Sequence, residues 1–385
     1  MEWKEVTLGE IAIFKTGKLN SNAAISNGEY PFFTCSPETL RINNYAFDQE
    51  AILLAGNNAD GNFSIKYYKG KFNAYQRTYV ITPIRGKVDI KYLYYALSLC
   101  LKQFKNMSQG TSTKFLTVKI LNSFSVQLPS ISDQRRIASI LSSLDRKIEL
   151  NNKINADLEE MAQAIFKNWF VDFEPFKDGK FVDSELGMVP EGWKVGTLGD
   201  MGTIVCGKTP SKANSNYYGG DIPFIKIPDM HGNVFVESSE DRLTEQGSLS
   251  QIKKLIPPYS LMVSCIATVG LVSINTKPSH TNQQINTIIP HNKSALFYLY
   301  QYIKNNEELL KNMGRGGTTT LNVNTKSFSN IRLFIPSDIA LLQFHQIVEG
   351  LFKKIELNMQ ESRTLSLLRD TLLPRLMSGE LEVPE

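Results

Sequence analysis

The sequence predicts a mixed α/β (α+β) fold, in which two homologous globular domains are joined by two long antiparallel coiled-coil helices with pseudo-two-fold symmetry. Three observations support this prediction: an internal repeat, short apolar runs between loops rich in Gly, Asn and Ser, and two long stretches of helical periodicity. The chain has 385 residues, of which 42% are hydrophobic and 21% charged, so it has enough apolar material for at least two compact domains. The predicted parts are 1–130, 131–192, 193–336 and 337–385.

The repeat runs through the whole chain in one order. Residues 3–10, Trp-Lys-Glu-Val-Thr-Leu-Gly-Glu, return at 193–200 as Trp-Lys-Val-Gly-Thr-Leu-Gly-Asp, 190 positions later. Residues 147–151, Lys-Ile-Glu-Leu-Asn, return at 354–358, 207 positions later. Further matches lie between these two in the same order. We infer a duplication in which the second copy gained loop residues.

The first part of each copy is expected to contain strands and one helix. Apolar runs at 51–55, 78–82, 260–266 and 286–290 are short enough for buried strands, and Gly, Asn and Ser surround them. Helical periodicity appears near 90–106 in the first copy and near 295–313 in the second. These patterns predict a sheet-based globule in each copy.

The second part of each copy, 133–172 and 338–378, shows helical periodicity with a seam at heptad spacing. Both seams become polar at the middle, and an antiparallel alignment that places Ile137 opposite Leu376 brings Asn155 opposite Asn358 and Asn151 opposite Ser362. A helix packed only on its own globule would explain one such seam, but two matched seams favour helix against helix. The residues expected at this coiled-coil and partner interface are Ile137, Leu144, Asn151, Asn155, Leu158, Trp169, Phe170, Phe344, Leu351, Asn358, Leu365 and Leu372.

Charge follows the same division. The formal net charge is only +4, but residues 1–130 carry +6 and 191–337 carry +4, whereas 131–190 and 338–385 carry −3 each. Basic globules joined to acidic helices indicate that the globules bind a polyanion and the helices bind protein. Differences of a few charges also occur on ordinary solvated surfaces, so the loops must supply the rest of the argument.

Four loops combine Gly with Lys, Arg, Gln and Thr, at 15–18, 108–114, 207–212 and 314–320. Such side chains bind phosphates and base edges, and Gly allows the backbone to approach closely. Ordinary structural turns are the alternative reading of each loop. The candidate DNA-binding residues, including those of two Gln-containing turns, are Lys15, Lys18, Gln76, Arg77, Gln109, Thr111, Thr113, Lys114, Lys208, Thr209, Lys212, Gln283, Gln284, Arg315, Thr318, Thr319 and Thr320.

Two motifs resemble catalytic signatures but lack the required context. Residues 202–209 match the phosphate-binding pattern GxxxxGK[ST], yet Pro210 and a polar loop follow where a helix should begin. Pro257-Pro258-Tyr259 resembles the catalytic loop of amino-methyltransferases, but Ile256 stands where that loop needs a polar residue. No catalytic residue and no metal site is therefore expected in this chain.

A cytoplasmic protein is expected. The longest mostly apolar stretch, 261–274, is interrupted by polar residues and is shorter than the ~20 residues that span a bilayer. The N-terminal residues carry acids and no apolar segment of the kind found in secretion signals. The four cysteines are widely separated, which suggests reduced thiols rather than disulfides.

Residues 166–176, Phe-Lys-Asn-Trp-Phe-Val-Asp-Phe-Glu-Pro-Phe, and 185–193, Glu-Leu-Gly-Met-Val-Pro-Glu-Gly-Trp, resemble the central conserved region of type I restriction-modification specificity subunits. Residues 372–381 resemble their distal conserved region. The resemblance covers the whole chain, because the duplicated order of globule and helix is the plan of that family. Where the copies diverge, chiefly 19–72 against 209–279, it does not identify the residues that touch bases.

The resemblance implies that each globule is a target recognition domain reading one half of a bipartite, asymmetric sequence in double-stranded DNA. It implies that the helices bind two methyltransferase subunits, which restriction/translocase subunits can join. S-adenosylmethionine, ATP and Mg²⁺ would then be bound by those partners, with no cofactor in this chain. Two alternatives are a P-loop or methyltransferase enzyme acting alone, and a protein-interaction scaffold.

Deleting a matched heptad from each helix, 152–158 with 359–365, is expected to shorten the preferred DNA spacer and leave both half-sites unchanged. The seam from 137 to 169 is ~48 Å long at ~1.5 Å per residue, comparable to ~14 base pairs at ~3.4 Å each. Mapping methylated adenines in cells that carry the shortened chain and its partner subunits measures the spacer. Retention of the original spacer would mean that helix length does not set it.

Overall fold

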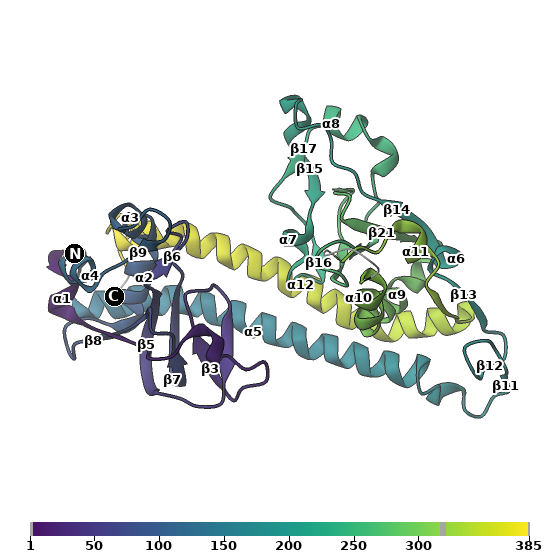
Figure 1. The fold of residues 1–385 in the computed structure, drawn as a ribbon, viewed down its shortest axis with the longest axis horizontal. Helices are drawn as coiled ribbons and strands as arrows, with labels where there is room; N and C mark the ends of the chain where they lie inside the picture. The colour runs from purple at the N-terminus through teal and green to yellow at the C-terminus, as the bar shows by residue number, and fades with distance from the viewer. Residues whose placement is uncertain (1–2, 316–320, 384–385) are drawn as a thin grey trace. The chain divides into compact units, whose positions relative to one another are not determined.

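The computed structural model describes residues 3–315 and 321–383, which form two compact units. Unit 1 comprises Met1–Glu149 with Ser362–Glu385, and unit 2 comprises Leu150–Glu361. Each unit contains one sheet-based globule and a part of each long helix, α5 (Ile131–Phe170) and α12 (Asp338–Met377) (Figure 1). The predicted helices at 133–172 and 338–378 are therefore confirmed. Among the described residues, no helix is both long and apolar enough to span a membrane.

The globule of unit 1 is built on a six-stranded sheet in the order β2-β8-β5-β7-β3-β4. The predicted strands at 51–55 and 78–82 are β5 and β8, which pair antiparallel in the interior of this sheet. The elements of the globule are β1 (Lys4–Thr7), α1 (Leu8–Ile11), β2 (Ala12–Thr16), β3 (Tyr30–Phe33), β4 (Thr39–Ile42), β5 (Phe47–Ala55), β6 (Asn57–Asn58), β7 (Ile65–Ala74), β8 (Thr78–Pro83), α2 (Ile90–Leu99), α3 (Leu101–Met107), β9 (Lys114–Phe115), α4 (Val118–Ser123) and β10 (Ser125–Leu128).

The globule of unit 2 has a five-stranded sheet, β14-β21-β18-β19-β16, and a three-stranded sheet, β17-β15-β20. The predicted strands at 260–266 and 286–290 are β18 and β21. Its elements are β13 (Lys194–Thr197), α6 (Leu198–Met201), β14 (Gly202–Cys206), β15 (Tyr218–Ile225), α7 (Ile227–Met230), β16 (Phe235–Val236), β17 (Arg242–Leu243), α8 (Glu245–Leu249), β18 (Leu261–Ser264), β19 (Val272–Asn275), β20 (His280–Thr281), β21 (Ile285–Pro290), α9 (Leu296–Asn305), α10 (Glu307–Gly314), α11 (Thr325–Ser329) and β22 (Arg332–Ile335).

Both globules begin with the same local structure, which explains the first match of the repeat. In unit 1 the backbone N–H of Thr7 donates to the Glu10 carboxylate at 2.7 Å. In unit 2 the backbone N–H of Thr197 donates to the Asp200 carboxylate at 2.8 Å. In each unit the carboxylate thus accepts a hydrogen bond from the threonine three residues before it. This capping box stabilises the N-terminus of a four-residue helix. The strand before that helix pairs with the last strand of the globule, β1 with β10 and β13 with β22.

The single helices expected near 90–106 and 295–313 are each broken in two, at Cys100 and at Asn306. The N–H of Cys100 bonds to the carbonyl of Leu97 at 3.0 Å, which tightens the turn and ends α2. At the second break, the Asn306 side chain donates to the carbonyl of Tyr302 at 2.8 Å. A side-chain amide that binds the backbone in this way competes with helix continuation.

In unit 1, α2 attaches the globule to the helices. Ile137 and Leu141 of α5 are fully buried, and they share one apolar core with Leu93 and Leu97 of α2 and with Leu376 of α12. Beside this core, the Tyr95 hydroxyl donates to Asp145 at 2.5 Å, and Arg369 of α12 donates to the same carboxylate at 2.7 Å. The predicted pairing of Ile137 with Leu376 agrees with this packing.

In unit 2, α9 has the corresponding role. Tyr298 of α9 packs edge-on against Phe170 of α5, with ring centroids 4.7 Å apart, and Phe170 packs on Phe344 of α12 at 4.9 Å. The Tyr300 hydroxyl donates to Glu159 of α5 at 3.0 Å. In both units, residues with higher numbers on α5 contact residues with lower numbers on α12. The prediction that the two helices run antiparallel is therefore confirmed within each unit.

The polar layer of the seam lies in unit 2. The Asn358 amide donates to the Asn155 side-chain oxygen at 2.9 Å, which confirms the predicted pairing of these residues. The Asn151 amide donates to the backbone carbonyl of Asn358 at 3.3 Å and to Glu361 at 2.8 Å. Asn151 and Asn358 are at most 1% exposed. Buried amides that bond to one another in this way favour one helix register over shifted ones.

Replacing Asn155 by Leu is expected to lower the free energy of unfolding by about 1–3 kcal/mol, because the buried Asn358 amide loses its acceptor. The double change Asn155→Leu with Asn358→Leu is expected to recover much of that loss, since no amide is left unpaired. Urea denaturation of the full chain followed by circular dichroism measures both. Asn152→Leu, on the exposed face of the same turn, is the matched control. A double variant that loses the sum of the two single losses would show that the two amides do not act as a pair.

A second prediction concerns His280, which is 0% exposed in β20. Its ring contacts the Ser248 hydroxyl at 2.8 Å and the Gln251 amide at 3.3 Å, and burial lowers the pKa of His280 to about 4. The unfolded chain, with a His pKa near 6.5, binds this proton more readily. The contribution of His280 to stability is therefore complete above about pH 6.5 and is lost as the pH falls toward 4.

Urea denaturation at several pH values between 6.5 and 5 measures how the free energy of unfolding changes with pH. This free energy is expected to fall less in His280→Gln than in wild type, whatever the absolute stability of the variant. His231→Gln, which removes an exposed histidine of the same unit, is the matched control substitution. Equal slopes in wild type and His280→Gln would mean that protonation of His280 is not linked to unfolding between pH 6.5 and 5.

Candidate nucleic-acid interface

Residues 15–18, predicted as a loop, are the end of β2 and the two residues after it, and they lie against the turn that carries Gln76 and Arg77. A Cβ on Gly17 would stand 1.7 Å from the carbonyl oxygen of Ala74, so only glycine allows this approach. The Gln76 N–H donates to the carbonyl of Leu19 at 2.9 Å, and its side-chain amide donates to Asn20 at 2.7 Å. Lys15, Lys18, Gln76 and Arg77 are all exposed. The structure therefore brings together two candidate loops that are 60 residues apart in sequence.

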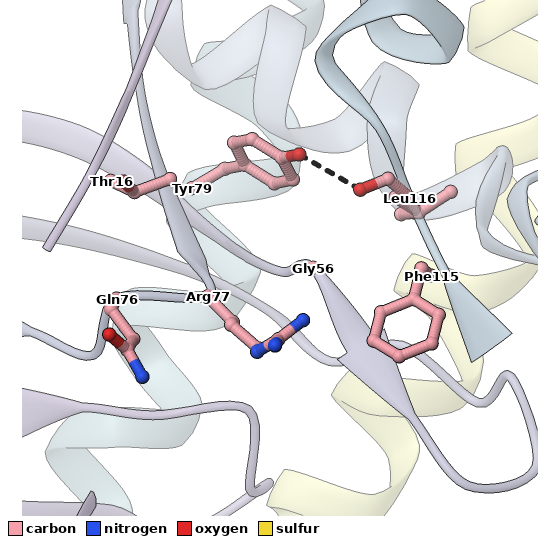
Figure 2. A pocket seen from close by; sticks show the side chains of 7 residues that line it. All are labelled: Thr16, Gly56, Gln76, Arg77, Tyr79, Phe115 and Leu116. Carbon is pink, nitrogen blue, oxygen red and sulfur yellow. Dashed lines mark hydrogen bonds between the residues drawn. The ribbon is translucent and has the colours of Figure 1, made fainter. Parts of the chain in front are cut away.

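The third candidate loop of unit 1 joins the same face through a short backbone ladder. The N–H of Gly56 donates to the carbonyl of Arg77 at 2.8 Å, and the N–H of Leu116 donates to the carbonyl of Gly56 at 2.9 Å. Figure 2 shows the resulting pocket, in which the Arg77 side chain extends toward the ring of Phe115. The guanidinium lies 5.3 Å from the ring centroid, within cation–π range. The pocket has a volume of about 340 Å³ and is lined by Thr16, Gly56, Gln76, Arg77, Tyr79, Phe115 and Leu116.

The loop 109–115 is a tight hairpin. Gln109 and Phe115 exchange both backbone hydrogen bonds, at 2.8 and 3.0 Å, and Gly110 at the turn has φ +102°. Gln109 and Thr111 are exposed, whereas Thr113 and Lys114 are half-buried. The hairpin is held to the globule by the pairing of β6 with β9, in which Asn57 lies opposite Phe115.

Lysines also border a second, less polar pocket of unit 1, of about 660 Å³. Lys15, Lys18, Tyr45 and Phe47 are among the residues that line it. Lys71 lies 4.7 Å from the centroid of the Tyr45 ring. The candidate face thus combines cationic side chains with aromatic rings, the combination that binds nucleic acid.

Unit 2 repeats the Gly-Lys arrangement. A Cβ on Gly207 would stand 2.2 Å from the carbonyl of Asn282, and the N–H of Lys208 donates to the carbonyl of Thr281 at 2.9 Å. The Thr209 hydroxyl donates to the side-chain oxygen of Gln283 at 2.7 Å. Lys208, Lys212 and Gln283 are exposed, and Thr209 and Gln284 are half-buried. Lys208 and Thr209 therefore lie beside the turn that carries Gln283 and Gln284, as their counterparts do in unit 1.

The same hydrogen bonds explain why residues 202–209 are unsuited to hold a nucleotide phosphate. A phosphate-binding loop needs free backbone N–H groups at the start of a helix. Here the N–H groups of Gly207 and Lys208 bond to the carbonyls of Ile285 and Thr281. The next helical element is a single 3₁₀ turn, Ser215–Tyr217, which begins six residues after Thr209. Residues 202–206 of the motif form β14, which pairs antiparallel with β21.

The ladder beside Arg77 also recurs. In unit 2 the N–H of Cys265 donates to the carbonyl of Gln284 at 2.8 Å, and the N–H of Val323 donates to the carbonyl of Cys265 at 2.8 Å. Arg315, at the end of α10, is exposed, and its guanidinium donates to the Asn312 side chain at 2.8 Å. The predicted contacts Thr318, Thr319 and Thr320 lie outside the described residues.

Sequence reasoning missed several residues of this face, namely Tyr45, Gly56 and Phe115. Phe115 follows Lys114 directly, so an aromatic residue next to a basic loop was the available signal. Gly56 and Tyr45 come from the most divergent part of the repeat, where no match between the copies pointed to them. Their position depends on the pairing of strands far apart in sequence.

The residues predicted for the helix interface are covered by their own units. Ile137, Asn151, Asn155, Phe170, Phe344 and Asn358 are buried, and Leu144, Leu158, Trp169, Leu351, Leu365 and Leu372 are half-buried. Other apolar side chains of the two helices are open to solvent, and none of them was predicted: Leu150 (51% exposed), Met161 (52%), Ile339 (70%), Leu342 (48%) and Leu367 (63%).

The central motif at 166–193 forms an aromatic cluster in unit 2. Phe170 packs on Trp193 with ring centroids 5.7 Å apart, and Trp193 contacts Phe173 at 5.6 Å and Phe176 at 5.1 Å. Phe173 adopts φ +56°, which turns the chain sharply after α5. The motif thus fixes the connection between α5 and the first strand of the second globule.

Comparisons with known proteins agree with this architecture. The sequence model of the family "Type I restriction modification DNA specificity domain" matches residues 1–160 and 190–366. The chain is 40% identical over 365 residues to the type I restriction enzyme HindI specificity subunit of Haemophilus influenzae, covering 78% of this chain and 80% of that protein. It is 31% identical over 316 residues to the MjaIX specificity subunit of Methanocaldococcus jannaschii, covering 79% and 72%.

A solved structure has the same fold. The crystal structure of the S subunit of a type I restriction-modification system from M. genitalium matches with a TM-score of 0.62 at 16% identity, covering 100% of this chain and 96% of that one. Since the family model matches both copies of the repeat and the relatives align over most of their length, the chain belongs to the family of type I restriction-modification DNA specificity subunits.

Proposed function

We propose that this chain is the DNA sequence-specificity subunit of a type I restriction-modification complex, with one globule for each part of a bipartite target. The observation that carries the proposal is the duplicated face. Each unit presents a Gly-Lys loop packed against a Gln-containing turn, and each turn is tied to a further loop by the same two backbone hydrogen bonds. A rigid backbone with variable side chains suits recognition of two unlike half-sites.

The charge distribution supports DNA as the ligand. Residues 1–130 carry +6 and 191–337 carry +4, and the exposed lysines Lys15, Lys18, Lys208 and Lys212 lie at the duplicated face. Lysines bind phosphates as point charges, while Gln and Arg are the side chains that most often read purine edges. The face therefore has groups for both kinds of contact.

The helices are the proposed docking site for two methyltransferase subunits. The helices α5 and α12 expose leucine, isoleucine and methionine side chains as well as acidic residues, and exposed apolar side chains that gather into patches mark protein contacts. Restriction/translocase subunits would join through those partners. We place methyl transfer and ATP hydrolysis, with S-adenosylmethionine, ATP and Mg²⁺, in the partner subunits. The loop at 202–209, whose backbone N–H groups are already bonded, supports that division of labour.

The half-sites are expected to respond separately to mutation. Replacing Gln109, Thr113 and Lys114 by Ala should relax one half-site, and replacing Arg315, Thr318 and Thr319 should relax the other, since a base contact is typically worth ~1–3 kcal/mol. The chain, co-expressed with the products of neighbouring genes, is assayed by mapping which adenines become methylated. An equal loss at all sequences would reassign these residues to phosphate contacts.

A salt titration separates DNA recognition from a protein scaffold. Binding of duplex DNA should weaken steeply as salt rises, because each phosphate contact releases a counterion. Binding to an acidic protein that duplex DNA fails to displace would favour the scaffold instead.

A further inference from the structure

The backbone ladder makes individual positions of the two globules comparable, even where the sequences diverge. The carbonyls of Arg77 and Gln284 accept from Gly56 and Cys265, and the carbonyls of those residues accept from Leu116 and Val323. The residues after Gly56 and Cys265 are also paired in the same way. Asn57 lies opposite Phe115 in unit 1, and Ile266 lies opposite Asn322 in unit 2. Arg77 and Phe115 in unit 1 therefore correspond to Gln284 and Asn322 in unit 2.

Arg77 is presented in a way that suits contact with a ligand. It is exposed, and its guanidinium lies over the Phe115 ring at 5.3 Å from the centroid. Within residues 3–315 and 321–383, no carboxylate forms an ion pair with it, and no hydrogen bond uses its N–H donors. The side chain reaches into the pocket beside the Phe115 ring, whose contact limits where the guanidinium can lie (Figure 2).

The chemistry of the guanidinium points to one base. A guanidinium donates two parallel hydrogen bonds, and the major-groove edge of guanine offers two acceptors, O6 and N7, at matching separation. An aromatic platform reduces the rotational freedom that the side chain loses on binding. We infer that Arg77 is the guanine-reading residue of the half-site recognised by unit 1, and that Phe115 is its positioning residue. This inference rests on the proposed function, because it names the base read at that face.

Unit 2 lacks both features. At the position of Arg77 it has Gln284, whose side-chain oxygen accepts from the amide of Asn282 at 2.9 Å, and at the position of Phe115 it has Asn322. An amide held in this way has neither the charge nor the two parallel donors that select guanine. The two globules thus differ in side chains at one shared backbone position, which makes the two half-sites unlike at the corresponding base.

The test uses the full chain, co-expressed and purified with the products of its neighbouring genes, and a library of random duplex DNA. Bound sequences are selected and read for wild type, Arg77→Gln and Arg77→Lys. Arg77→Gln introduces the residue of unit 2, and Arg77→Lys keeps the charge but removes the planar fork. Arg85→Gln is the matched control, since it removes the same charge at the other end of β8 and is also exposed.

Wild type is expected to select a G at one position of one half-site. Both Arg77 variants should lose that preference by roughly 5- to 150-fold, the range of one bidentate contact, with every other position unchanged. Arg85→Gln should select the wild-type sequence. Phe115→Leu should relax the same position, and Phe115→Tyr, which keeps the ring, should restore it. Circular dichroism melting of each variant verifies folding.

Three results would overturn the assignment. An equal loss of affinity for all sequences in Arg77→Lys would make Arg77 a phosphate contact. A changed preference for a base other than G would refute the base named here while leaving the proposed function intact. Wild-type protein that selects no sequence at all would refute the proposed function, and the assignment with it.

Discussion

Burial of the apolar seam along α5 and α12 is the constraint on which the rest of the structure depends. Each helix has 40 residues, and neither could be stable alone in water with a seam of Leu, Ile and Phe exposed. In each unit the two helices run antiparallel and share their core with one helix of the globule, α2 or α9. The globule and the helix pair thus complete one another's hydrophobic core. Asp145 and Glu159 on α5 add hydrogen bonds to tyrosines of those same helices, which fix the globule on the seam.

The duplication supplies one backbone twice, and recognition then depends on side chains. Gly17 and Gly207 are required where the loop backbone touches a strand end, and the ladders through Gly56 and Cys265 tie a third segment to the same place. These bonds satisfy backbone groups and do not depend on which side chain is attached. Side chains such as Arg77 and Gln284 can consequently differ between the copies without disturbing the fold. A backbone of this kind allows the DNA specificity to change by substitution of side chains while the fold is kept.

The same backbone bonding separates recognition from catalysis. Residues 202–209 have the letters of a phosphate-binding motif, but 202–206 form β14, the N–H groups of Gly207 and Lys208 bond to backbone carbonyls, and the next helical element is a single 3₁₀ turn, Ser215–Tyr217. A match to the sequence pattern is therefore not sufficient to predict phosphate binding, because binding depends on the geometry of the backbone N–H groups. The histidine in this part of unit 2, His280, is likewise committed to the core, where it bonds to Ser248 and Gln251.

The sequence by itself determined the duplication, both long helices to within two residues, their antiparallel register at Asn155 and Asn358, and two interior strands of the largest sheet in each globule. It could do so because the repeat and the heptad spacing are local or periodic patterns that need no knowledge of distant contacts. Only the tertiary structure decided that Cys100 and Asn306 interrupt the helices of the globules, because single side-chain and turn hydrogen bonds end them. It also decided which loops meet, since Phe115, Gly56 and Arg77 become neighbours only through pairing of strands far apart in the chain. Long-range backbone pairing of this kind leaves no period in the sequence, and this is why the composition of the recognition face could be predicted in part but its arrangement could not.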